Sequence, residues 1–412
     1  MDGLTVLGLE TSCDETAASV VRLSAAGAEV LSSVIHSQID DHAAYGGVVP
    51  EIAARSHVEM IDGVTRRAMA EAGLDWSALD GVAATAGPGL VGGVMVGLSY
   101  GKAAALARGL PLIAVNHLEG HAVSARLGAE TTYPFLLLLV SGGHCQLLEV
   151  RGIGDMSRLG TTIDDAAGEA FDKIAKAMGL GYPGGPALER LAASGDGSRF
   201  ELPRALLGRK DCDFSFSGLK TAASRLAQTC ETDQDRADLA DAVQKAIARQ
   251  LAERTERAMK AYAEAHPELA DGALKQPSAA REAVGLDQDA LKQPSAAREA
   301  VGLDQDALKQ PSAAREAAGR KLFVVAGGVA ANKTIRRTLE DLATKYGFAF
   351  LAPPMAYCTD NAAMIALAGA ERLEKGLTSD IDVAARPRWP LDETRASVDP
   401  VHKKTGRKGA KA

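Results

Sequence analysis

The chain has few of the features that mark secreted and membrane proteins. Its five cysteines are scattered, odd in number and never spaced as CxxC, so we expect reduced thiols. Its longest apolar run, residues 134–140, is far too short to span a bilayer. No basic segment precedes an apolar one at the first residues. We therefore expect a cytoplasmic protein with no membrane partner.

Basic residues are also in deficit. The formal net charge of −7 argues against a surface covered with nucleic-acid-binding side chains, although a local basic patch remains compatible with it. Lysines and an arginine do gather in residues 400–412, where we expect a solvated, disordered tail. With 412 residues, of which 46% are hydrophobic, the chain is long enough for two domains with separate cores.

Histidine is scarce, yet two of the eight histidines stand four residues apart in Asn-His-Leu-Glu-Gly-His, residues 116–121. Positions i and i+4 share one face of a helix, with Cβ atoms about 5 to 6 Å apart. His117 and His121 could therefore bind one metal ion; the alternative is one capping and one packed histidine. In zinc peptidases the motif is H-E-x-x-H. Glu119 lies about 200° around the helix from His117, which argues against that class.

A strand, a small polar turn and a returning strand occur twice. Residues 4–10 and 17–23 form the first such pattern, and residues 134–140 and 145–150 form the second. The second turn, Ser-Gly-Gly-His at 141–144, offers backbone amides to an anion. One hairpin at the start of each half predicts an internally duplicated α/β fold.

The glycine motifs resemble nucleotide-binding loops only in part. Residues 87–92 match G-x-G-x-x-G after a predicted strand, but no carboxylate stands about twenty residues further on to bind a ribose. A P-loop also fails, because Ala103 follows Gly101-Lys102 where a hydroxyl should bind magnesium. These glycines are better explained by close helix packing.

Acids cluster at the start of a helix expected from Asp164 onward. Asp165, Glu169 and Asp172 share one helical face, where their repulsion must be offset. A solvated acidic face and the recognition of ligand hydroxyls both fit this pattern. Residues 213–217 alternate as in a strand. Asp360 begins the last apolar helix, where it could be simply the N-cap.

Residues 273–318 hold an exact 17-residue repeat, in two copies and part of a third. Each copy contains a proline, so we expect a surface insertion or short helical spur and no core.

Taken in chain order, several motifs resemble the bacterial tRNA adenosine threonylcarbamoyltransferase family, formerly named O-sialoglycoprotein endopeptidases: LGLETSCDETAASVV, YGGVVPEIAARSH, TAGPGLVGG, NHLEGH, LLLVSGGH, IDDAAGEAFDK, YPGGP, DFSFSGLKT, AGGVAAN, CTDNAAMIA and RPRWPL. The resemblance implies an actin/Hsp70/sugar-kinase-like fold, with two related α/β domains around a nucleotide cleft. We expect residues 1–131 to form the first domain, with helix 358–378 packing back on it. Residues 132–357 would form the second, interrupted by the repeat.

The resemblance also implies the reaction. Threonylcarbamoyl would pass from threonylcarbamoyl-adenylate to the exocyclic amine of the adenosine 3′ of the anticodon, in tRNAs that read codons beginning with A. A small paralogous actin-fold protein and a small ATPase are the implied partners.

Site residues carried over from the family fall into three groups. One divalent ion, Fe²⁺ or Zn²⁺, would be held by His117, His121 and Asp360. Asp14 and Glu15 would lie near the cleft, in positioning or proton removal. The adenylate positions match Leu139, Val140, Ser141, Gly142, Gly143, Asp172, Gly185 and Asn332.

Two other functions deserve comparison. A metal-dependent endopeptidase conflicts with the position of Glu119. An ATP-dependent chaperone or regulatory module could use the same fold, since fold alone does not set function, but it leaves His117, His121 and Asp360 without a role.

Overall fold

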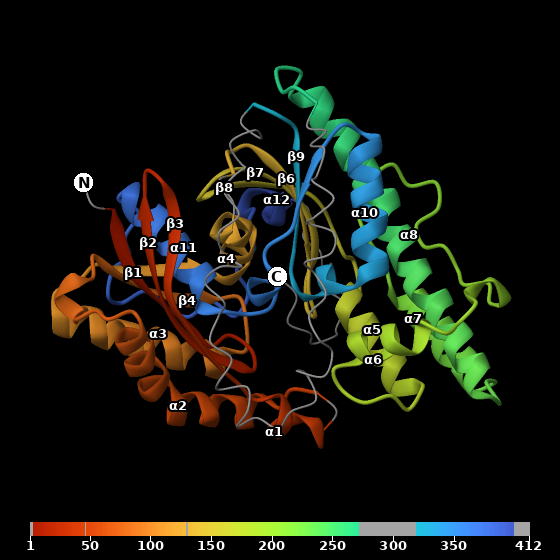
Figure 1. Ribbon diagram of the computed structural model, residues 1–412, viewed down its shortest axis with the longest axis horizontal. Helices are drawn as coiled ribbons and strands as arrows, with labels where there is room; N and C mark the ends of the chain where they lie inside the picture. The colour runs from red at the N-terminus through yellow and green to blue at the C-terminus, as the bar shows by residue number, and fades with distance from the viewer. Residues whose placement is uncertain (1–2, 46, 129–130, 272–318, 399–412) are drawn as a thin grey trace.

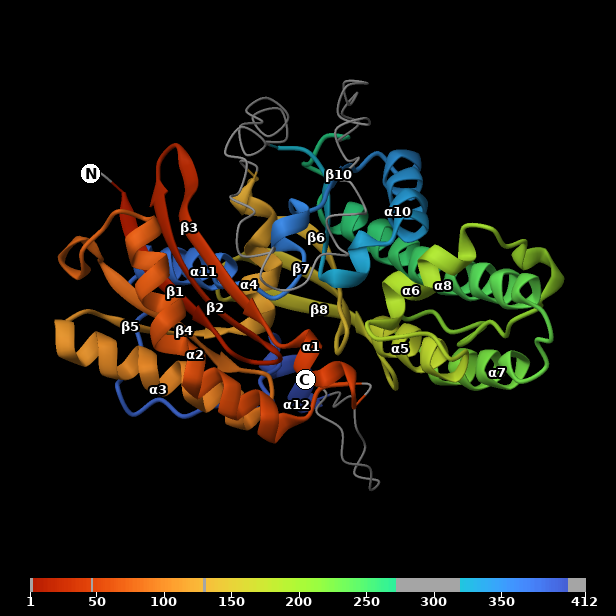
Figure 2. The same cartoon turned by 60° about the horizontal axis from the view of Figure 1, so that its bottom comes forward.

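The computed structural model describes residues 3–45, 47–128, 131–271 and 319–398. These residues form two five-stranded sheets with helices around and between them (Figure 1 and Figure 2). The predictions for the repeat at 273–318 and the tail at 400–412 fall outside the described residues. Within the described ranges no helix is both long and apolar enough to cross a membrane.

The first sheet has the strand order β3-β2-β1-β4-β5. Its first three strands are antiparallel neighbours, and β4 and β5 run parallel to β1. The strands are β1 (Leu4–Glu10), β2 (Glu15–Ser24), β3 (Gly27–Ser37), β4 (Gly81–Gly87) and β5 (Leu112–Asn116).

The second sheet repeats this arrangement, with the order β10-β9-β6-β7-β8. Again three strands form an antiparallel meander and two more are parallel to its first strand. The predicted internal duplication is therefore confirmed, although the sequence pattern did not reveal β8 and β10. The strands are β6 (Phe135–Val140), β7 (Cys145–Gly152), β8 (Asp155–Thr161), β9 (Leu322–Ala326) and β10 (Ala349–Leu351).

Helices cover both faces of the first sheet. Because successive side chains of a strand point to opposite faces, Leu7 and Leu9 of β1 join the core beneath α2 (Pro50–Glu71) and α3 (Val91–Arg108). Val6 joins the core beneath α11 (Ala362–Glu374). Short elements complete this half: α1 (Ile39–Ala43), η1 (Trp76–Ala78) and η2 (Ser124–Leu127).

The second sheet is covered in the same way. Leu136 and Leu138 of β6 face one core with the outer helices, while Leu137 and Leu139 face another with α4 (His117–Val123). The outer helices are α5 (Ala167–Ala177), α6 (Gly184–Ala192), α7 (Ser217–Ala227), α8 (Asp233–Ala265) and α10 (Lys333–Lys345). The remaining elements are η3 (Gly197–Arg199), η7 (Gly328–Ala331), η8 (Met355–Tyr357) and α12 (Glu393–Val398).

Two helices, α4 and α11, occupy the layer between the sheets (Figure 1). The contact of α11 with β1 is close, because an ideal Cβ on Gly8 would lie 2.4 Å from the carbonyl oxygen of Ala362. This packing brings the start of α11 toward the carboxyl end of β1.

The glycines of the nucleotide-like motif serve in packing, as predicted. An ideal Cβ on Gly87, at φ 134°, would lie 1.9 Å from the carbonyl oxygen of Arg386. One on Gly89 would lie 2.6 Å from Ser12. Neither position has room for a side chain, so both glycines permit close packing.

Three predictions about helices and strands are wrong. The helix expected at residues 358–378 spans only Ala362–Glu374. Residues 213–217 form no strand; the described contacts include one isolated bridge from Phe214 to Thr162. The carboxylate of Asp164 instead accepts the backbone N–H groups of Phe216 and Ser217, at 2.8 and 3.1 Å. Asp164 precedes α5, which begins only at Ala167.

Thr11 inserts its hydroxyl into α3. Its Oγ1 accepts from the amide of Gly97 at 3.1 Å and donates to the carbonyl oxygen of Gly93 at 2.8 Å. An ideal Cβ on Gly97 would lie 2.3 Å from Oγ1 of Thr11.

We expect Gly97→Ala to lower the free energy of unfolding by about 1 to 3 kcal/mol, measured by denaturant titration. Gly63→Ala is the control, because Gly63 is at an exposed position of α2 and its Cβ would meet no described atom within 4 Å. It should stabilise by about 0.5 to 1 kcal/mol, and equal effects of the two variants would contradict this account.

Candidate metal centre

The histidine motif forms the short helix α4, which begins directly after β5. Asn116 is its N-cap: the side-chain oxygen accepts from the amide of Leu118 at 2.9 Å, and Nδ2 donates to the carbonyl oxygen of Trp389 at 2.8 Å. Gly120 faces α11, where an ideal Cβ would lie 2.8 Å from Cδ1 of Ile365. The cap and the glycine thus fix where α4 starts and how closely it approaches α11.

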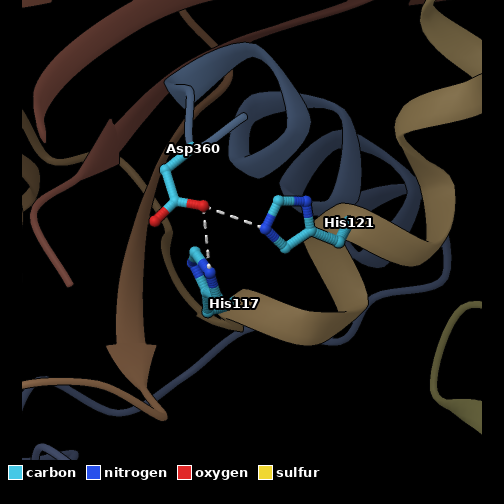
Figure 3. A group of neighbouring side chains, drawn as sticks. All are labelled: His117, His121 and Asp360. Atoms are coloured by element: carbon cyan, nitrogen blue, oxygen red, sulfur yellow. Dashed lines mark hydrogen bonds and ion pairs between the residues drawn. The ribbon is translucent and has the colours of Figure 1, made fainter. Parts of the chain in front are cut away.

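His117 and His121 point toward the carboxylate of Asp360 (Figure 3). Nε2 of His121 lies 3.0 Å, and Nε2 of His117 3.5 Å, from Oδ1 of Asp360. One donor atom from each residue falls within 4.8 Å of the others. Asp360 is available for this group because Asn361, not Asp360, caps α11: its Oδ1 accepts from the amide of Met364 at 3.0 Å. The alternative reading of Asp360 as an N-cap is therefore wrong.

A buried carboxylate orients His117 from the other side. Oε2 of Glu10 lies 2.9 Å from Nδ1 of His117 and accepts the hydroxyl of Thr85 at 2.6 Å. The hydroxyl of Ser12 lies 3.1 Å from the same ring nitrogen. Carboxylates in this position fix the tautomer of a metal-binding histidine and leave Nε2 to coordinate. Nδ1 of His121, in contrast, is buried without a hydrogen-bond partner among the described residues.

The electrostatics of the group favour a bound cation. Burial lowers the pKa of His117, but Asp360 and Glu10 outweigh it and raise this pKa to about 9. Burial raises the pKa of Asp360, yet His117 and His121 hold it well below its usual range. The buried carboxylate of Glu10 and the partly exposed carboxylate of Asp360 thus share the positive charge of His117. A divalent ion could replace the proton of His117.

The residues fit such an ion. Two imidazoles and one carboxylate suit iron or zinc. Ligands about 2.0 to 2.2 Å from a common zinc lie about 3 to 3.5 Å from one another. The distances of 3.0 and 3.5 Å from Asp360 to the imidazoles already fall in that range.

Asp14 and Glu15 lie close to the same group. Asp14 is buried, with 6% of its surface exposed. Burial, Asp360 and Asp14 together raise the pKa of Glu15 well above its ordinary value, which favours its protonated form. Of the two acids predicted to lie near the cleft, Glu15 is thus electrostatically linked to Asp360 and to Asp14.

The Ser-Gly-Gly turn lies at the end of β6, against the start of α5. The amide of Gly168 donates to the carbonyl oxygen of Ser141 at 3.2 Å. Cβ atoms on Gly142 and Gly143 would meet no described atom within 4 Å, so the turn is open. The side chains of Leu139 and Val140 are fully buried. These two residues can therefore offer a ligand backbone groups only.

The other adenylate positions lie on neighbouring elements of the second half. Oδ1 of Asp172, on α5, accepts from the amide of Gly184 at 2.9 Å, at the start of α6. The next residue, Gly185, has open space where a side chain would be. Asn332 caps α10, its Oδ1 accepting from the amide of Ile335 at 3.0 Å. Asp172 and Asn332 thus already have local structural partners.

The acidic face resolves into two parts. Lys173 Nζ lies 3.1 Å from Asp165 and 2.7 Å from Glu169, and Lys220 Nζ lies 2.6 Å from Asp165. These lysines offset the repulsion. Asp172 is separate from this group. Burial raises its pKa, and the amides of Gly184 and Gly185 offset only part of that rise.

Sequence reasoning missed Glu10 and Ser12. Glu10 is a carboxylate at the end of an apolar strand, with its side chain fully buried. An acid in that position is costly unless it has a partner, and this is the signal that could have revealed it.

Comparison with known proteins identifies the family. The model of TsaD, tRNA N6-adenosine threonylcarbamoyltransferase, matches residues 29–294 and 282–367. The chain belongs to this family. Proteins of that name from Caulobacter vibrioides and Maricaulis maris are 62% and 52% identical to it. Each alignment covers 99% of this chain, and 98% and 96% of the respective relative. The resemblance drawn from the motifs is thus confirmed, and the chain is a tRNA-modifying transferase.

The fold is actin/Hsp70/sugar-kinase-like, as expected from the sequence. HypF of T. kodakarensis aligns with 90% of this chain and 48% of its own, with a TM-score of 0.50 and 13% identity. At that identity the likeness concerns the fold alone.

Glu10→Gln should weaken metal binding in this threonylcarbamoyltransferase about 10- to 100-fold, because outer partners of metal-binding histidines typically contribute that much. Competition with a chromophoric chelator measures the affinity. Glu371→Gln is the matched control, since Glu371 is a buried carboxylate paired with Arg126 and Tyr133. If both variants bound metal like the wild type, Glu10 would have no orienting role.

Proposed function

We propose that this enzyme transfers threonylcarbamoyl from threonylcarbamoyl-adenylate to the exocyclic amine of the adenosine 3′ of the anticodon, in tRNAs that read codons beginning with A. The observation that carries the proposal is the convergence of His117, His121 and Asp360, from two distant segments, in a chain of this family. The amine nitrogen forms a bond to the carbamoyl carbon, the bond to the phosphate oxygen breaks, and AMP and a proton leave.

His117, His121 and Asp360 would hold one divalent ion, Fe²⁺ or Zn²⁺. When bound, such an ion supplies a Lewis acid that polarises the carbamoyl oxygen and orients the threonyl group. Glu10 keeps Nδ1 of His117 hydrogen-bonded and so directs Nε2 toward the ion.

The adenylate would lie against the second sheet, along Leu139 to Gly143, Asp172, Gly185 and Asn332. The open turn at Gly142 and Gly143 beside the start of α5 supports this, because such backbone amides attract a phosphate. Asp172 supports hydroxyl recognition less directly, since one of its oxygens already accepts from Gly184.

The exocyclic amine of adenine is a weak nucleophile because its lone pair is delocalised into the ring. The enzyme must therefore hold it in line with the carbamoyl carbon, and its proton must leave. We propose that Asp14 and Glu15 act in positioning the amine or in receiving this proton. The raised pKa of Glu15 favours its protonated form, which suits the positioning role. The burial of Asp14 and the electrostatic effect of Asp360 on Glu15 support a role in this part of the site. No covalent intermediate with the protein is required.

The rival functions receive less support. A peptidase would need Glu119 as general base beside the metal ligands, whereas this carboxylate contacts Arg372 and the amide of Gly154. A chaperone would have no use for His117, His121 and Asp360. A cytoplasmic location, where tRNA is available, agrees with the five free cysteines of the described chain.

Transfer can be tested with purified protein, its partners, threonylcarbamoyl-adenylate and unmodified tRNA, followed by mass spectrometry of the nucleosides. Wild type should form threonylcarbamoyladenosine, and His121→Ala should lose at least about 100-fold in rate, because one ligand is removed from the ion. His266→Ala is the control, since His266 pairs with Glu149 and Glu268 instead. Failure of the wild type, where a related enzyme succeeds, would contradict the proposed reaction.

We further propose that a small paralogous actin-fold protein docks on the helices of the first half and that a small ATPase joins the complex. Apolar side chains exposed on the contacting helices α2 and α3 support this: Val58 at 63%, Val91 at 51% and Met95 at 54%. Val91 and Met95 stand four residues apart on α3, and apolar side chains exposed on one helix face favour a protein interface.

Met95→Glu should weaken capture of the paralogous partner about tenfold or more, because a charge would be buried in an apolar contact. Pull-down with the tagged partner measures the effect. Leu207→Glu, at an equally exposed apolar position of the second half, should leave capture unchanged. Equal capture by the wild type and Met95→Glu would exclude this surface.

A further inference from the structure

Glu119 is the carboxylate of the histidine motif, and the proposed reaction does not use it. Its side chain is buried, with 3% of the residue exposed. Its Oε2 lies 2.9 Å from Nη1 of Arg372, and its Oε1 accepts from the amide of Gly154 at 2.8 Å. Arg372 belongs to α11, which packs on the first sheet, whereas Gly154 forms the turn between β7 and β8 of the second sheet. One carboxylate on α4 therefore joins both halves of the molecule.

Neighbouring contacts strengthen this junction. Nζ of Lys375, just after α11, donates to the carbonyl oxygen of Ile153 at 3.2 Å. The side chain of Ile153 is buried in the same core as α11. The β7–β8 turn is thus held between α4 and the carboxyl end of α11, by one carboxylate, one ammonium group and one apolar side chain.

The apolar packing of α4 would not by itself fix its register. Leu118 and Ala122 pack against the second sheet, but apolar contacts are non-directional. A charged hydrogen bond to one backbone amide is directional and is stronger than a neutral one. Glu119 is therefore the group that best defines where α4 lies along the second sheet.

We propose that Glu119 is a positioning residue, which sets the separation between the metal-ligand face of α4 and the open turn at Ser141–Gly143. This inference rests on the proposed function, in which the threonylcarbamoyl end of the donor meets His117, His121 and Asp360 while its phosphate meets that turn. A ligand that spans both sites depends on their separation. AMP contacts the second-sheet positions alone and does not.

This difference gives a test that does not depend on activity. Isothermal titration with threonylcarbamoyl-adenylate and with AMP compares the two ligands on metal-loaded wild type and Glu119→Ala. We expect the variant to keep its metal content and to bind AMP within about twofold of wild type. Its Kd for the donor should rise about tenfold or more, and kcat should fall at least as much, since small misplacements cost about 100-fold in rate.

Asp238→Ala is the matched control. Asp238 is also a buried carboxylate that accepts from a backbone amide, that of Asp196 at 2.7 Å, and pairs with Arg199. All three residues belong to the second half, so this variant should lose comparable stability and leave donor affinity unchanged. Thermal unfolding of both variants sets a temperature at which each remains folded.

Lys375→Met provides a second variant, because the residue is exposed and its loss is compatible with folding. It should weaken donor binding about twofold or more and leave AMP binding unchanged. If the wild type binds the donor and both Glu119→Ala and Lys375→Met bind it equally well, the positioning role is wrong while the proposed function stands. If metal-loaded wild type binds neither donor nor AMP, the proposed function and this inference fail together.

Discussion

The packing of the seven-residue helix α4 between α11 and the second sheet is the contact on which the rest of the site depends. Each position of its motif meets a different neighbour. Asn116 caps the helix, Leu118 packs on the second sheet, and Gly120 lets α11 approach. His117 and His121 lie on the side of α4 that faces the carboxylate of Asp360. A helix this short has little stability of its own, so its geometry is a product of these tertiary contacts.

Burial of charge follows from that arrangement. Glu10 and His117 are buried, and Asp360 beside them is partly exposed. Isolated charges in such surroundings are costly. They are mutually paired, and the pKa of His117 rises to about 9 because both carboxylates outweigh its burial. A protein core gains little stability from such a group. The divalent ion proposed for this site would explain why the group is present.

In the duplicated fold, the two sheets position different residues of the site. The first sheet, through β1 and the start of α11, brings Glu10 and Asp360 together. The second sheet ends β6 in an open turn beside α5. In the proposed function, the donor lies across both sheets. Contacts that join the two halves, such as those of Glu119, would therefore affect donor binding.

The features of the fold and the site that could be predicted from the sequence are those with local sequence signals. The i,i+4 spacing of the histidines, the direction of Glu119 and the repeated hairpins all depend on periodicity, and the structure agrees with each. The pairing of His121 with Asp360 spans 239 positions, so spacing could not supply it; only the family resemblance did.

The errors have physical causes too. Residues 213–217 alternate like a strand, but the amides of Phe216 and Ser217 donate to the carboxylate of Asp164 and not to a neighbouring strand. The short strand β10 has only three residues, too few to show a period. Glu10 was missed because its partner lies 107 residues away.

The most direct test of this account is X-ray absorption at the metal edge of the iron- or zinc-loaded enzyme. The spectra should show two imidazole ligands, with oxygen as the remaining atoms bound to the metal, and one imidazole fewer in His121→Ala. A sulfur ligand, or an unchanged imidazole number in that variant, would contradict the central claim that α4 and Asp360 together form the metal centre.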